Sequence, residues 1–361
     1  MGADAPDLGR PALSVVIVTY NAVRLISACL DSLRREADGM VLEVFVVDNG
    51  SSDGTSARVR SQHPWVQLHD TGCNLGFSAG NNVALPLCKG RLVMLLNPDT
   101  IVQPGALRTL CDALQQHPQA GAVGPMLCLA DGSIQPESAR HLPRPGNLLP
   151  WLLLLDKVAA RLGLSALPEP NVQDPQAPQG HWFDRFNLLG WQRATGCAVQ
   201  SLCGACILMR HEVLQQVGLL DDASPMYLDD IDYCRRILDA GWQIRYVAQA
   251  RVTHLWQQST HPQRAGLHYA LGLHAIWLYL GKHHGARAAQ AFAAMALAAA
   301  LLRLPPAALA AALPGAGRPE RQRRLRMAMG LWTWAWTFPK SPPRLGFAHE
   351  VAHEVAREVP R

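Results

Sequence analysis

The sequence of 361 residues has few charged and aromatic side chains, which make up 17% and 6% of it. Its apolar content of 49% is too high, and its net charge of +5 too low, for a chain that is mostly disordered. The 29 glycines and 26 prolines follow no period, which excludes a collagen-like repeat. The nine cysteines are scattered along the chain, which excludes a small disulfide-bonded scaffold. The chain is instead long enough to bury one large core or two ordinary ones.

Several motifs are also missing. Met1–Asp4 is acidic and no apolar segment typical of a secretory signal follows it, so we expect a reducing compartment and free thiols. Neither GxGxxG nor a GxxxxGKS/T loop occurs, which leaves a dinucleotide-binding Rossmann domain and a P-loop NTPase without their main support. Cys203 and Cys206 form a CxxC, but no second pair stands at zinc-site spacing and both are expected in an apolar strand.

The basic residues are concentrated near the C-terminus. Gly281–Arg361 holds 12 Lys and Arg against 4 Asp and Glu, a net +8, while Met1–Leu280 holds 21 against 24, a net −3. A basic segment rich in Ala, Leu and Trp on a slightly acidic body indicates an anionic membrane surface as its partner rather than nucleic acid.

Apolar runs of strand length alternate with segments of helical length in the first 130 residues. Strands are expected over Leu13–Thr19, Leu42–Val47, Val66–His69 and Arg91–Leu96, and helices over Val23–Arg34, Asp53–Gln62 and Ser78–Leu87. This order predicts a parallel, doubly wound sheet. Ligands of such sheets bind beyond the carboxyl ends of the strands. The polar residues that follow these strands are therefore expected at one edge of the sheet.

The pattern changes after residue 142. The segment Leu148–Leu155 is apolar nearly all round, which fits either a core helix or a membrane-docking helix, and Pro168–Gly180 is a Pro/Gln-rich loop. Further on we expect a strand over Ser201–Arg210, a helix over Ile231–Ala240, a strand over Gln243–Val247 and helices after Leu267. The apolar stretch Ala288–Leu302 is shorter than the roughly 20 residues that span a bilayer, and its flanking Arg287 and Arg303 and the run Leu331–Trp336 are typical of interfacial anchors.

Two carboxylates near strand ends have both a chemical and a structural interpretation. Asp48 can accept hydrogen bonds from a base edge or a ribose hydroxyl, but the segment also suits a turn with an N-cap at Ser52 or Asp53. Asp99, in Asn97-Pro98-Asp99, can reach a divalent metal, since Mg²⁺ and Mn²⁺ prefer one or two carboxylates plus phosphate oxygens. A turn stiffened by proline is the alternative there.

A second group of candidates lies further along the chain. Asp229, Asp230 and Asp232 stand at the front of an expected helix, where acids complement the helix dipole. Adjacent carboxylates also raise one another's pKa, as a general base near neutrality requires. His254 follows the strand-like segment Arg251–Thr253 and is either a structural histidine or a metal ligand.

The order of these blocks is more informative than any one of them. In chain order they are LSVVIVTYN (13–21), VVDNGSSDGT (46–55), NLGFSAGNN (74–82), LLNPDT (95–100), CGACILMR (203–210), VGLLDD (217–222), MYLDDIDYCRR (226–236) and ARVTH (250–254). Together they resemble a family 2 glycosyltransferase, with the greatest likeness to bacterial rhamnosyltransferases that build O-antigen or other cell-surface glycans. The resemblance covers roughly Leu13–His284.

This resemblance implies a fold and a domain organisation. The fold is α/β of the GT-A type, a Rossmann-like mixed sheet flanked by helices, with a C-terminal helical membrane-associating extension. The catalytic domain is expected over 11–265, with 11–130 binding the nucleotide sugar and 131–265 the acceptor. The extension is expected over 266–340 and a tail over 341–361.

The resemblance also implies roles for particular residues. Asn97 stands at the first position of the family's DxD motif, Asp99 is the metal-binding carboxylate and His254 a second ligand for Mg²⁺ or Mn²⁺. Asp230 is the favoured general base, with Asp229 beside it. The residues implied to hold or border the nucleotide sugar are Thr19, Tyr20, Asn21, Asp48, Gly76, Phe77, Gly80, Asn81 and Asn97. Those implied on the acceptor side are Gly204, Ala205 and Asp232.

The implied activity is the inverting transfer of a sugar to a hydroxyl of a lipid-linked glycan. L-Rhamnose from dTDP-L-rhamnose is the first choice of donor, and a UDP-hexose or UDP-N-acetylhexosamine is the alternative. Such an enzyme would be cytoplasmic and peripherally associated with the inner membrane, with no nucleic acid as partner.

Other classes explain the sequence less well. A processive polysaccharide synthase needs several spanning helices and a QxxRW motif, and a nucleotide-sugar pyrophosphorylase needs a Gly-rich loop, whereas Val16–Asn21 contains no glycine. From a different class, a membrane adaptor with a decayed fold would have lost the acids at the metal and base positions. Asp48, Asp99, Asp230 and His254 are all present.

Overall fold

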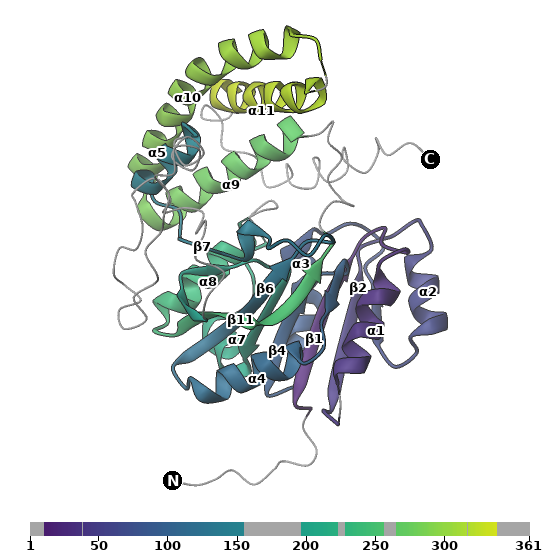
Figure 1. Ribbon diagram of the computed structural model, residues 1–361. Coiled ribbons are helices and arrows are strands. Elements are labelled where there is room, and N and C mark those ends of the chain that lie inside the picture. Colours follow the sequence, from purple (N-terminus) through teal and green to yellow (C-terminus); the bar gives the residue numbers. More distant parts are fainter. Residues whose placement is uncertain are drawn as a thin grey trace. The chain divides into compact units, whose positions relative to one another are not determined.

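A computed structural model describes residues 11–37, 39–154, 196–222, 228–255, 265–315 and 317–337 (Figure 1). The chain divides into two compact units. The described residues of the first unit lie within Met1–Ala139, Gln192–Asp222 and Tyr233–Leu255, and those of the second within Arg140–Trp191, Ala223–Asp232 and Trp256–Arg361. The predicted loop Pro168–Gly180 and the predicted tail 341–361 lie outside the described residues.

The first unit is built around a mixed sheet with the strand order β3-β2-β1-β4-β10-β6-β11-β5, and β8 pairs with β11. Strands β3, β2, β1 and β4 run parallel to one another, as the alternating pattern predicts. Strand β10 is antiparallel to both of its neighbours, which makes the sheet mixed. Its strands are β1 (Leu13–Thr19), β2 (Leu42–Asp48), β3 (Gln67–Asp70), β4 (Leu92–Leu96), β5 (Thr100–Val102), β6 (Ala120–Cys128), β8 (Cys197–Val199), β10 (Cys206–Arg210) and β11 (Gln243–His254).

Short helices connect these strands. They are α1 (Ile26–Glu36), α2 (Thr55–Gln62), α3 (Phe77–Ala84), α4 (Ala106–Gln116) and α7 (His211–Val217), with 3-10 turns at Leu85–Leu87 and Pro136–Ser138 and short strands β7 (Ala139–Arg140) and β9 (Ser201–Leu202). Helix α8 (Asp229–Asp239) begins in the second unit and continues into the first. The second unit also holds α5 (Pro145–Leu152), α9 (Ala265–His284), α10 (Ala286–Ala312) and α11 (Arg318–Thr337).

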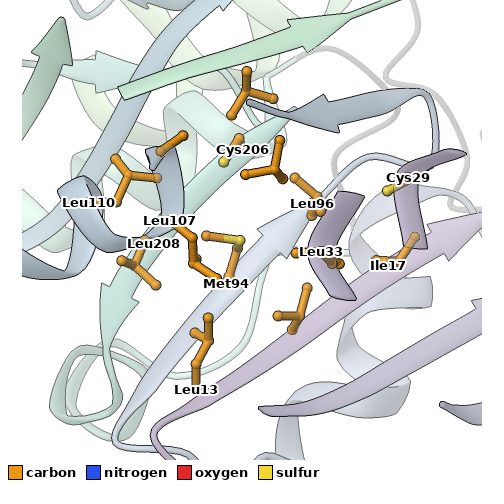
Figure 2. Packing of buried hydrophobic residues seen from close by; sticks show 14 of the residues in the cluster. Leu13, Ile17, Cys29, Leu33, Met94, Leu96, Leu107, Leu110, Cys206 and Leu208 are labelled. Carbon is orange, nitrogen blue, oxygen red and sulfur yellow. The ribbon is translucent and has the colours of Figure 1, made fainter. Parts of the chain in front are cut away.

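The core of the first unit explains why these segments fold as they do. Every residue of β1 from Leu13 to Ile17 is buried, as expected of a strand whose sheet is covered on both faces. Leu13, Val15 and Ile17 alternate along one face of the strand and enter one apolar cluster. In α1 the buried positions recur at three- and four-residue spacing and include Leu33, which gives one apolar helix face. The same cluster takes in Met94 and Leu96 of β4 and Leu208 of β10 (Figure 2). One face of the sheet and the helices α1 and α4 thus share a single apolar cluster.

Two sequence predictions for the later strands are wrong. The segment Ser201–Arg210 is not one strand, because the chain turns at Cys203–Ala205 and separates β9 from β10. The strand predicted over Gln243–Val247 extends to His254, since register shifts keep β11 paired with β6 beyond the first five residues. Both differences bear on the site, because they place the 203–205 turn and His254 next to Asn97-Pro98-Asp99.

The second unit is helical, and its helices approach closely. Gly266 of α9 and Gly330 of α11 lie so near one another that a Cβ on Gly330 would be 2.2 Å from the Gly266 carbonyl oxygen. Helix α10 has 27 residues, so the prediction that its apolar stretch is too short to span a bilayer is wrong. By length and composition alone, this is the one helix among the described residues that is able to cross a membrane.

A buried histidine makes the second unit sensitive to acid. His274 of α9 is 1% exposed, and burial lowers its pKa from 6.5 to about 4. The unfolded chain therefore takes up a proton below pH 6.5 that the folded chain resists, so stability falls as the pH drops from 6.5 toward 4. We expect the free energy of unfolding to be about 2 kcal/mol lower at pH 5.0 than at pH 7.5 from this group.

Chemical denaturation of the whole chain at both pH values measures this difference. A His274→Leu variant should lose the acid-dependent part, whereas His284→Leu, at an exposed position of the same helix, should keep it. An unchanged pH dependence in His274→Leu would show that another group is responsible.

Candidate active site

The carboxyl ends of the parallel strands meet at one edge of the first unit, as predicted. Thr19 pairs with Asp48 in the β1–β2 register, and Asp48 pairs with Asp70 in the β2–β3 register. The amide of Asn49 donates a hydrogen bond of 2.8 Å to the Thr19 carbonyl, which continues the pairing beyond the strands. Asn97 follows the end of β4, the other neighbour of β1. Thr19, Asp48 and Asn97 therefore lie along one edge.

The loop after β1 is fixed to the loop after β2. The Asn21 amide donates to Ser51 Oγ at 2.8 Å, and the Ser52 amide donates to Asn21 Oδ1 at 2.9 Å. The Val23 amide donates to Asp53 Oδ2 at 3.0 Å. Asn21 has φ of 50°, a left-handed conformation that asparagine tolerates better than most residues. These bonds hold the loop in place, and Tyr20, the residue before Asn21, is 36% exposed at its surface.

Asp48 and Thr19 are buried more deeply than a simple contact role suggests. The Asp48 carboxylate is 0% exposed and accepts hydrogen bonds from the Ser51 amide at 3.1 Å and from the hydroxyls of Ser51 and Ser56. Thr19 is also 0% exposed, and its Oγ1 has no hydrogen-bond partner among the described residues. In this structure Asp48 organises the turn after β2. The nucleotide contacts implied for both residues stay predictions.

The segment around α3 is shaped by glycines. Gly76, at φ of 85°, precedes the helix, and its carbonyl accepts a hydrogen bond of 2.9 Å from the Asn49 side chain. A Cβ on Gly80 would lie 2.8 Å from Val18 Cγ1, so only glycine lets α3 approach β1 this closely. Phe77 begins the helix half-buried, and the Asn81 side chain donates to the Phe77 carbonyl at 2.9 Å. The predicted donor-binding segment is thus held against the strand ends.

A carboxylate and an imidazole face one another at the same end of the sheet. His254 Nε2 lies 3.3 Å from Asp99 Oδ1, and the side chains are 5% and 12% exposed. The antiparallel pairing of β11 with β5 causes this contact, because His254 is in register with Thr100 and the Leu255 amide donates to the Asp99 carbonyl at 2.9 Å. The structure therefore brings together the two residues that the resemblance implied as metal ligands.

Gln135 completes this arrangement and was not predicted from the sequence. Its side-chain oxygen lies 2.8 Å from His254 Nδ1, and the residue is buried. An amide oxygen can only accept, so this contact favours the tautomer with the proton on Nδ1, and Nε2 is the nitrogen that faces Asp99. Gln135 stands in the short segment after β6, where its backbone amide donates a hydrogen bond of 2.9 Å to the Leu127 carbonyl. No strand end or motif marks it, which is why sequence analysis missed it.

The donor set suits a divalent cation that keeps several ligands from its substrate. The carboxylate of Asp99 and the imidazole of His254 are both ordinary metal ligands, and Oδ1 of the one faces Nε2 of the other. No group of three or more His, Cys, Asp and Glu side chains that suits a metal ion is found within the described parts of the chain. Asp99 and His254 would therefore supply two ligands, and diphosphate oxygens and water the rest, as Mg²⁺ and Mn²⁺ allow.

The turn at Cys203–Ala205 lies against Asn97. The Asn97 amide donates to the Ala205 carbonyl at 3.0 Å, and Gly204 and Ala205 are buried. Burial raises the pKa of the Cys206 thiol, which keeps it protonated, as expected of a cysteine that packs as a small apolar residue. Gly204 and Ala205 thus shape the backbone beside Asn97-Pro98-Asp99. Their predicted acceptor contacts stay predictions.

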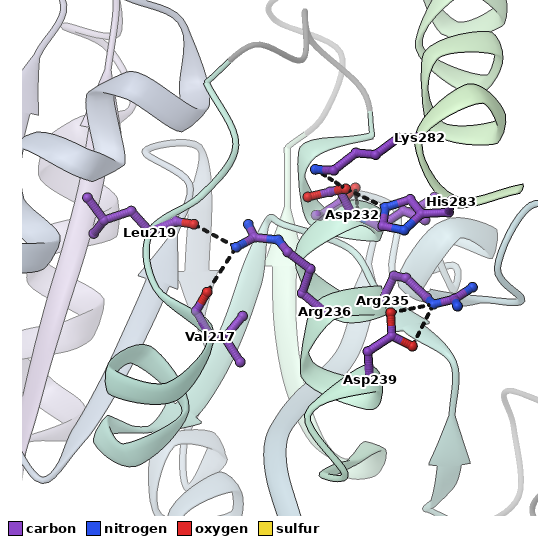
Figure 3. A network of polar contacts seen from close by, with 10 residues as sticks. Val217, Leu219, Asp232, Arg235, Arg236, Asp239, Lys282 and His283 are labelled. Carbon is purple, nitrogen blue, oxygen red and sulfur yellow. Dashed lines mark hydrogen bonds and ion pairs between the residues drawn. The ribbon is translucent and has the colours of Figure 1, made fainter. Parts of the chain in front are cut away.

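The predicted acids of the second unit begin α8. Asp229 is 5% exposed, whereas Asp230 is half-buried, and Asp230 Oδ1 accepts a hydrogen bond of 2.8 Å from the Ile231 amide. Asp232 is held by the end of α9, since its Oδ1 lies 2.8 Å from Lys282 Nζ and 2.7 Å from His283 Nε2 (Figure 3). The structure shows Asp232 fixing the start of α8, and the acceptor contact predicted for it stays a prediction.

Comparison with known proteins identifies the fold and the family of this chain. The fold is that of GT-A glycosyltransferases: the chain matches a mannosyltransferase from Pyrobaculum calidifontis, solved with GDP-Man and Mn²⁺, with a TM-score of 0.53 at 19% identity, over 93% of this chain and 90% of that one. Residues 11–269 match the family described as Glycosyltransferase like family 2. The protein belongs to this family and is a glycosyltransferase.

Relatives with assigned activities are found among enzymes of glycan assembly. The N-acetylglucosaminyl-diphospho-decaprenol L-rhamnosyltransferase of Mycobacterium tuberculosis is 31% identical over 287 residues, which cover 75% of this chain and 85% of the relative. A low-salt glycan biosynthesis hexosyltransferase of Haloferax volcanii is 26% identical over 229 residues. The match covers 62% of this chain and 61% of the length of that relative. The likeness to rhamnosyltransferases noted in the sequence is confirmed.

Proposed function

We propose that the protein transfers L-rhamnose from dTDP-L-rhamnose to a hydroxyl of a glycan carried on a lipid diphosphate. The observation that carries the proposal is the Asp99–His254 pair, 3.3 Å apart at the carboxyl edge of a family 2 sheet. The choice of donor and acceptor is supported by the mycobacterial relative, whose name states a rhamnosyl transfer to a diphospho-decaprenol acceptor.

The nucleotide sugar would bind along the edge formed by the strand ends. Tyr20 and Asn21 present the rigid loop after β1, Asp48 shapes the turn beside it, and Gly76 and Phe77 open α3. Because this loop is held before the donor arrives, little ordering entropy is lost on binding. Asn97 in place of a first acid leaves less negative charge around the diphosphate, so binding of metal and donor would be coupled.

A divalent cation fits the residues present, and Mg²⁺ or Mn²⁺ is the proposed cofactor. Asp99 and His254 would hold it, and when bound it offsets the charge that develops on the departing nucleoside diphosphate. Gln135 keeps the His254 ring in the tautomer that offers Nε2.

The role of Gln135 can be tested by binding alone. In Gln135→Leu the His254 ring loses its acceptor, and we expect the affinity for Mn²⁺ in the presence of nucleoside diphosphate to fall about 10–100-fold. Titration calorimetry measures this, with Gln119→Leu, an exposed glutamine of the same unit, as control. Gln135→Glu keeps an acceptor oxygen and should rescue most of the affinity. Unchanged Mn²⁺ binding in Gln135→Leu would remove Gln135 from this role.

The acceptor hydroxyl would be activated by the acids that begin α8. Asp230 is the favoured base because it is more exposed than Asp229, and because Lys282 and His283 already bind Asp232. Asp230 takes the proton of the acceptor hydroxyl, whose oxygen forms a bond to the anomeric carbon as the bond to the diphosphate oxygen breaks. A single displacement of this kind inverts the anomeric configuration.

A lipid-linked acceptor places the enzyme at the cytoplasmic face of the inner membrane. The basic and apolar segment 266–340 is proposed as the membrane-associating part and 11–265 as the catalytic part, with 341–361 as a tail. The Leu148–Leu155 stretch is described up to Leu154, and its first five residues belong to α5 (Pro145–Leu152). Leu148 and Leu152 are buried, which favours the interpretation as a core helix.

A donor panel tests the proposal directly. The full-length protein is offered dTDP-rhamnose and UDP-sugars with Mg²⁺, Mn²⁺ or EDTA, and nucleoside-diphosphate release and thermal shift are followed. A response to dTDP-rhamnose alone is expected. A response to a UDP-sugar alone keeps the enzyme class and overturns the rhamnosyl assignment. No response, even to free nucleotides, would favour a non-catalytic adaptor.

A further inference from the structure

The outer face of α10 is apolar from Ala291 to the end of the helix at Ala312. Its exposed positions recur at three- and four-residue spacing, at Ala291, Ala294, Ala298, Leu302, Pro305 and Leu309, and so lie on one side of the helix. Leu302 and Leu309 are 65% and 72% exposed. No exposed position from Ala291 to Ala312 carries a charged or hydrogen-bonding side chain. This face is about 32 Å long at the rise of an α-helix.

The opposite face of α10 is already packed. Phe292 and Ala296 are buried, and the Phe292 ring lies 5.6 Å from the Trp334 ring of α11. Helices α5, α9 and α11 all contact α10. A helix that packs on one side and faces water on the other carries polar residues on its outer side. In α10 both sides are apolar, so its outer face is suited to a medium other than water.

Helix α10 holds Arg287 in its first turn and Arg303 further along, and Arg303 is turned away from the outer face. Arg303 donates from Nη1 to the Leu152 carbonyl at 3.1 Å, at the end of α5, and to Tyr269 Oη at 2.9 Å. Its guanidinium also lies 5.5 Å from the centre of the Tyr269 ring. The charge thus satisfies a carbonyl that a helix end leaves without a partner. It does not interrupt the apolar surface.

Basic residues stand at both ends of the face. Arg287 is exposed at the start of α10, and the first half of α11 holds five arginines, of which Arg323 and Arg324 are 50% and 60% exposed. Glu320 is the only acid in that half-helix and lies within 3.3 Å of both. An apolar strip bounded by arginines complements a bilayer whose headgroups are anionic.

The arrangement of α11 favours a helix that lies in the membrane plane over one that crosses it. Arg321 donates to the Leu313 and Pro314 carbonyls at 2.9 and 3.1 Å, and Trp334 packs on Phe292, so α11 returns along α10. A crossing α10 would carry the arginines of α11 to the far side and leave too few apolar residues to return. Lying flat, the same pair keeps the exposed arginines of α11 on the water side of the membrane.

We propose that α10 docks this protein on an anionic lipid surface, with its outer face at the boundary of headgroups and acyl chains and its axis in the membrane plane. The proposal deepens the proposed function, on which it rests for the need to meet a lipid-linked acceptor. Its consequence is that the second unit stays at the surface where the acceptor diphosphate lies, without a spanning segment.

Vesicle binding by the full-length protein tests the proposal. Sedimentation with phosphatidylcholine vesicles and with vesicles holding three parts in ten of phosphatidylglycerol gives the partition constants. The double variant Leu302→Glu, Leu309→Glu should bind the anionic vesicles on the order of 10²-fold more weakly, because two buried leucines are lost. The control Val41→Glu, Leu87→Glu changes two exposed apolar residues of the first unit, by the same charge, and should bind normally. Both variants alter exposed positions, and circular dichroism checks their folding.

Other outcomes separate this proposal from the proposed function. Unchanged vesicle binding by the α10 variant overturns it, as does resistance of the wild-type protein to alkaline carbonate extraction, which would indicate a spanning helix. A wild-type dimer that the α10 variant dissociates, without vesicle binding, would assign the face to a second copy of the chain. Nucleoside-diphosphate release from soluble donor does not depend on docking. If the wild-type protein binds vesicles but releases no nucleoside diphosphate from any donor, the proposed function is overturned and the docking proposal stands.

Discussion

Asp230→Asn is expected to lower the turnover of the enzyme by on the order of 10²–10⁴ while leaving donor binding nearly unchanged. The substitution removes the ability to take a proton but keeps the shape of the side chain. It also keeps the oxygen that accepts the Ile231 amide at 2.8 Å, so the start of α8 is preserved. The effect should therefore appear in kcat with lipid-linked acceptor, whereas thermal shift by nucleotide sugar stays the same.

Three further variants make this result interpretable. Asp239→Asn, at an exposed position of the same helix that pairs with Arg235, should leave turnover unchanged. Asp229→Asn should have a smaller effect than Asp230→Asn, because Asp229 is 5% exposed and less able to meet a substrate. Asp232→Asn should chiefly lower stability, since it removes the carboxylate that Lys282 and His283 bind. Full turnover in Asp230→Asn would move the base to Asp229 or Asp232.

The sequence predicted the part of the site that depends on local pattern. The strand ends at Thr19 and Asp48 follow from apolar runs, and the parallel order of β1 to β4 follows from the alternation of strands and helices. The pairing of Asp99 with His254 did not follow from any pattern, because the two residues are far apart in the chain. It entered through the family resemblance, and the β5–β11 register explains it physically.

What the sequence missed depends on packing. Whether Thr19 presents its hydroxyl to a ligand is decided by the residues that cover it, and it is 0% exposed. Gln135 acts through a hydrogen bond to His254 that only the folded chain creates. Asp232 looks like its neighbours in sequence, yet residues from the end of α9 bind it. The length of α10 was underestimated because Arg303 was taken as its flank, whereas α5 and α9 provide partners that keep this arginine inside the helix.

Asp99→Asn should abolish most of the metal-dependent activity, a fall in kcat/KM of on the order of 10²–10⁴, because several kcal/mol of charge stabilisation at the leaving diphosphate would be lost. The amide keeps the volume of the carboxylate, and the backbone carbonyl that accepts the Leu255 amide at 2.9 Å is unaffected, so β5 and β11 stay paired. The loss should be electrostatic rather than structural.

Binding separates this loss from a general defect. Mn²⁺ titrated in the presence of nucleoside diphosphate should bind the Asp99→Asn protein far more weakly than wild type, whereas Asp131→Asn, which changes an exposed carboxylate of the same unit, should bind normally. Because Asn97 already replaces one acid of the family motif, Asp99 is the only carboxylate in Asn97-Pro98-Asp99, and no neighbour in that segment can take over. Wild-type Mn²⁺ affinity in Asp99→Asn would place the cation elsewhere and leave the Asp99–His254 contact as a structural contact at the paired ends of β5 and β11.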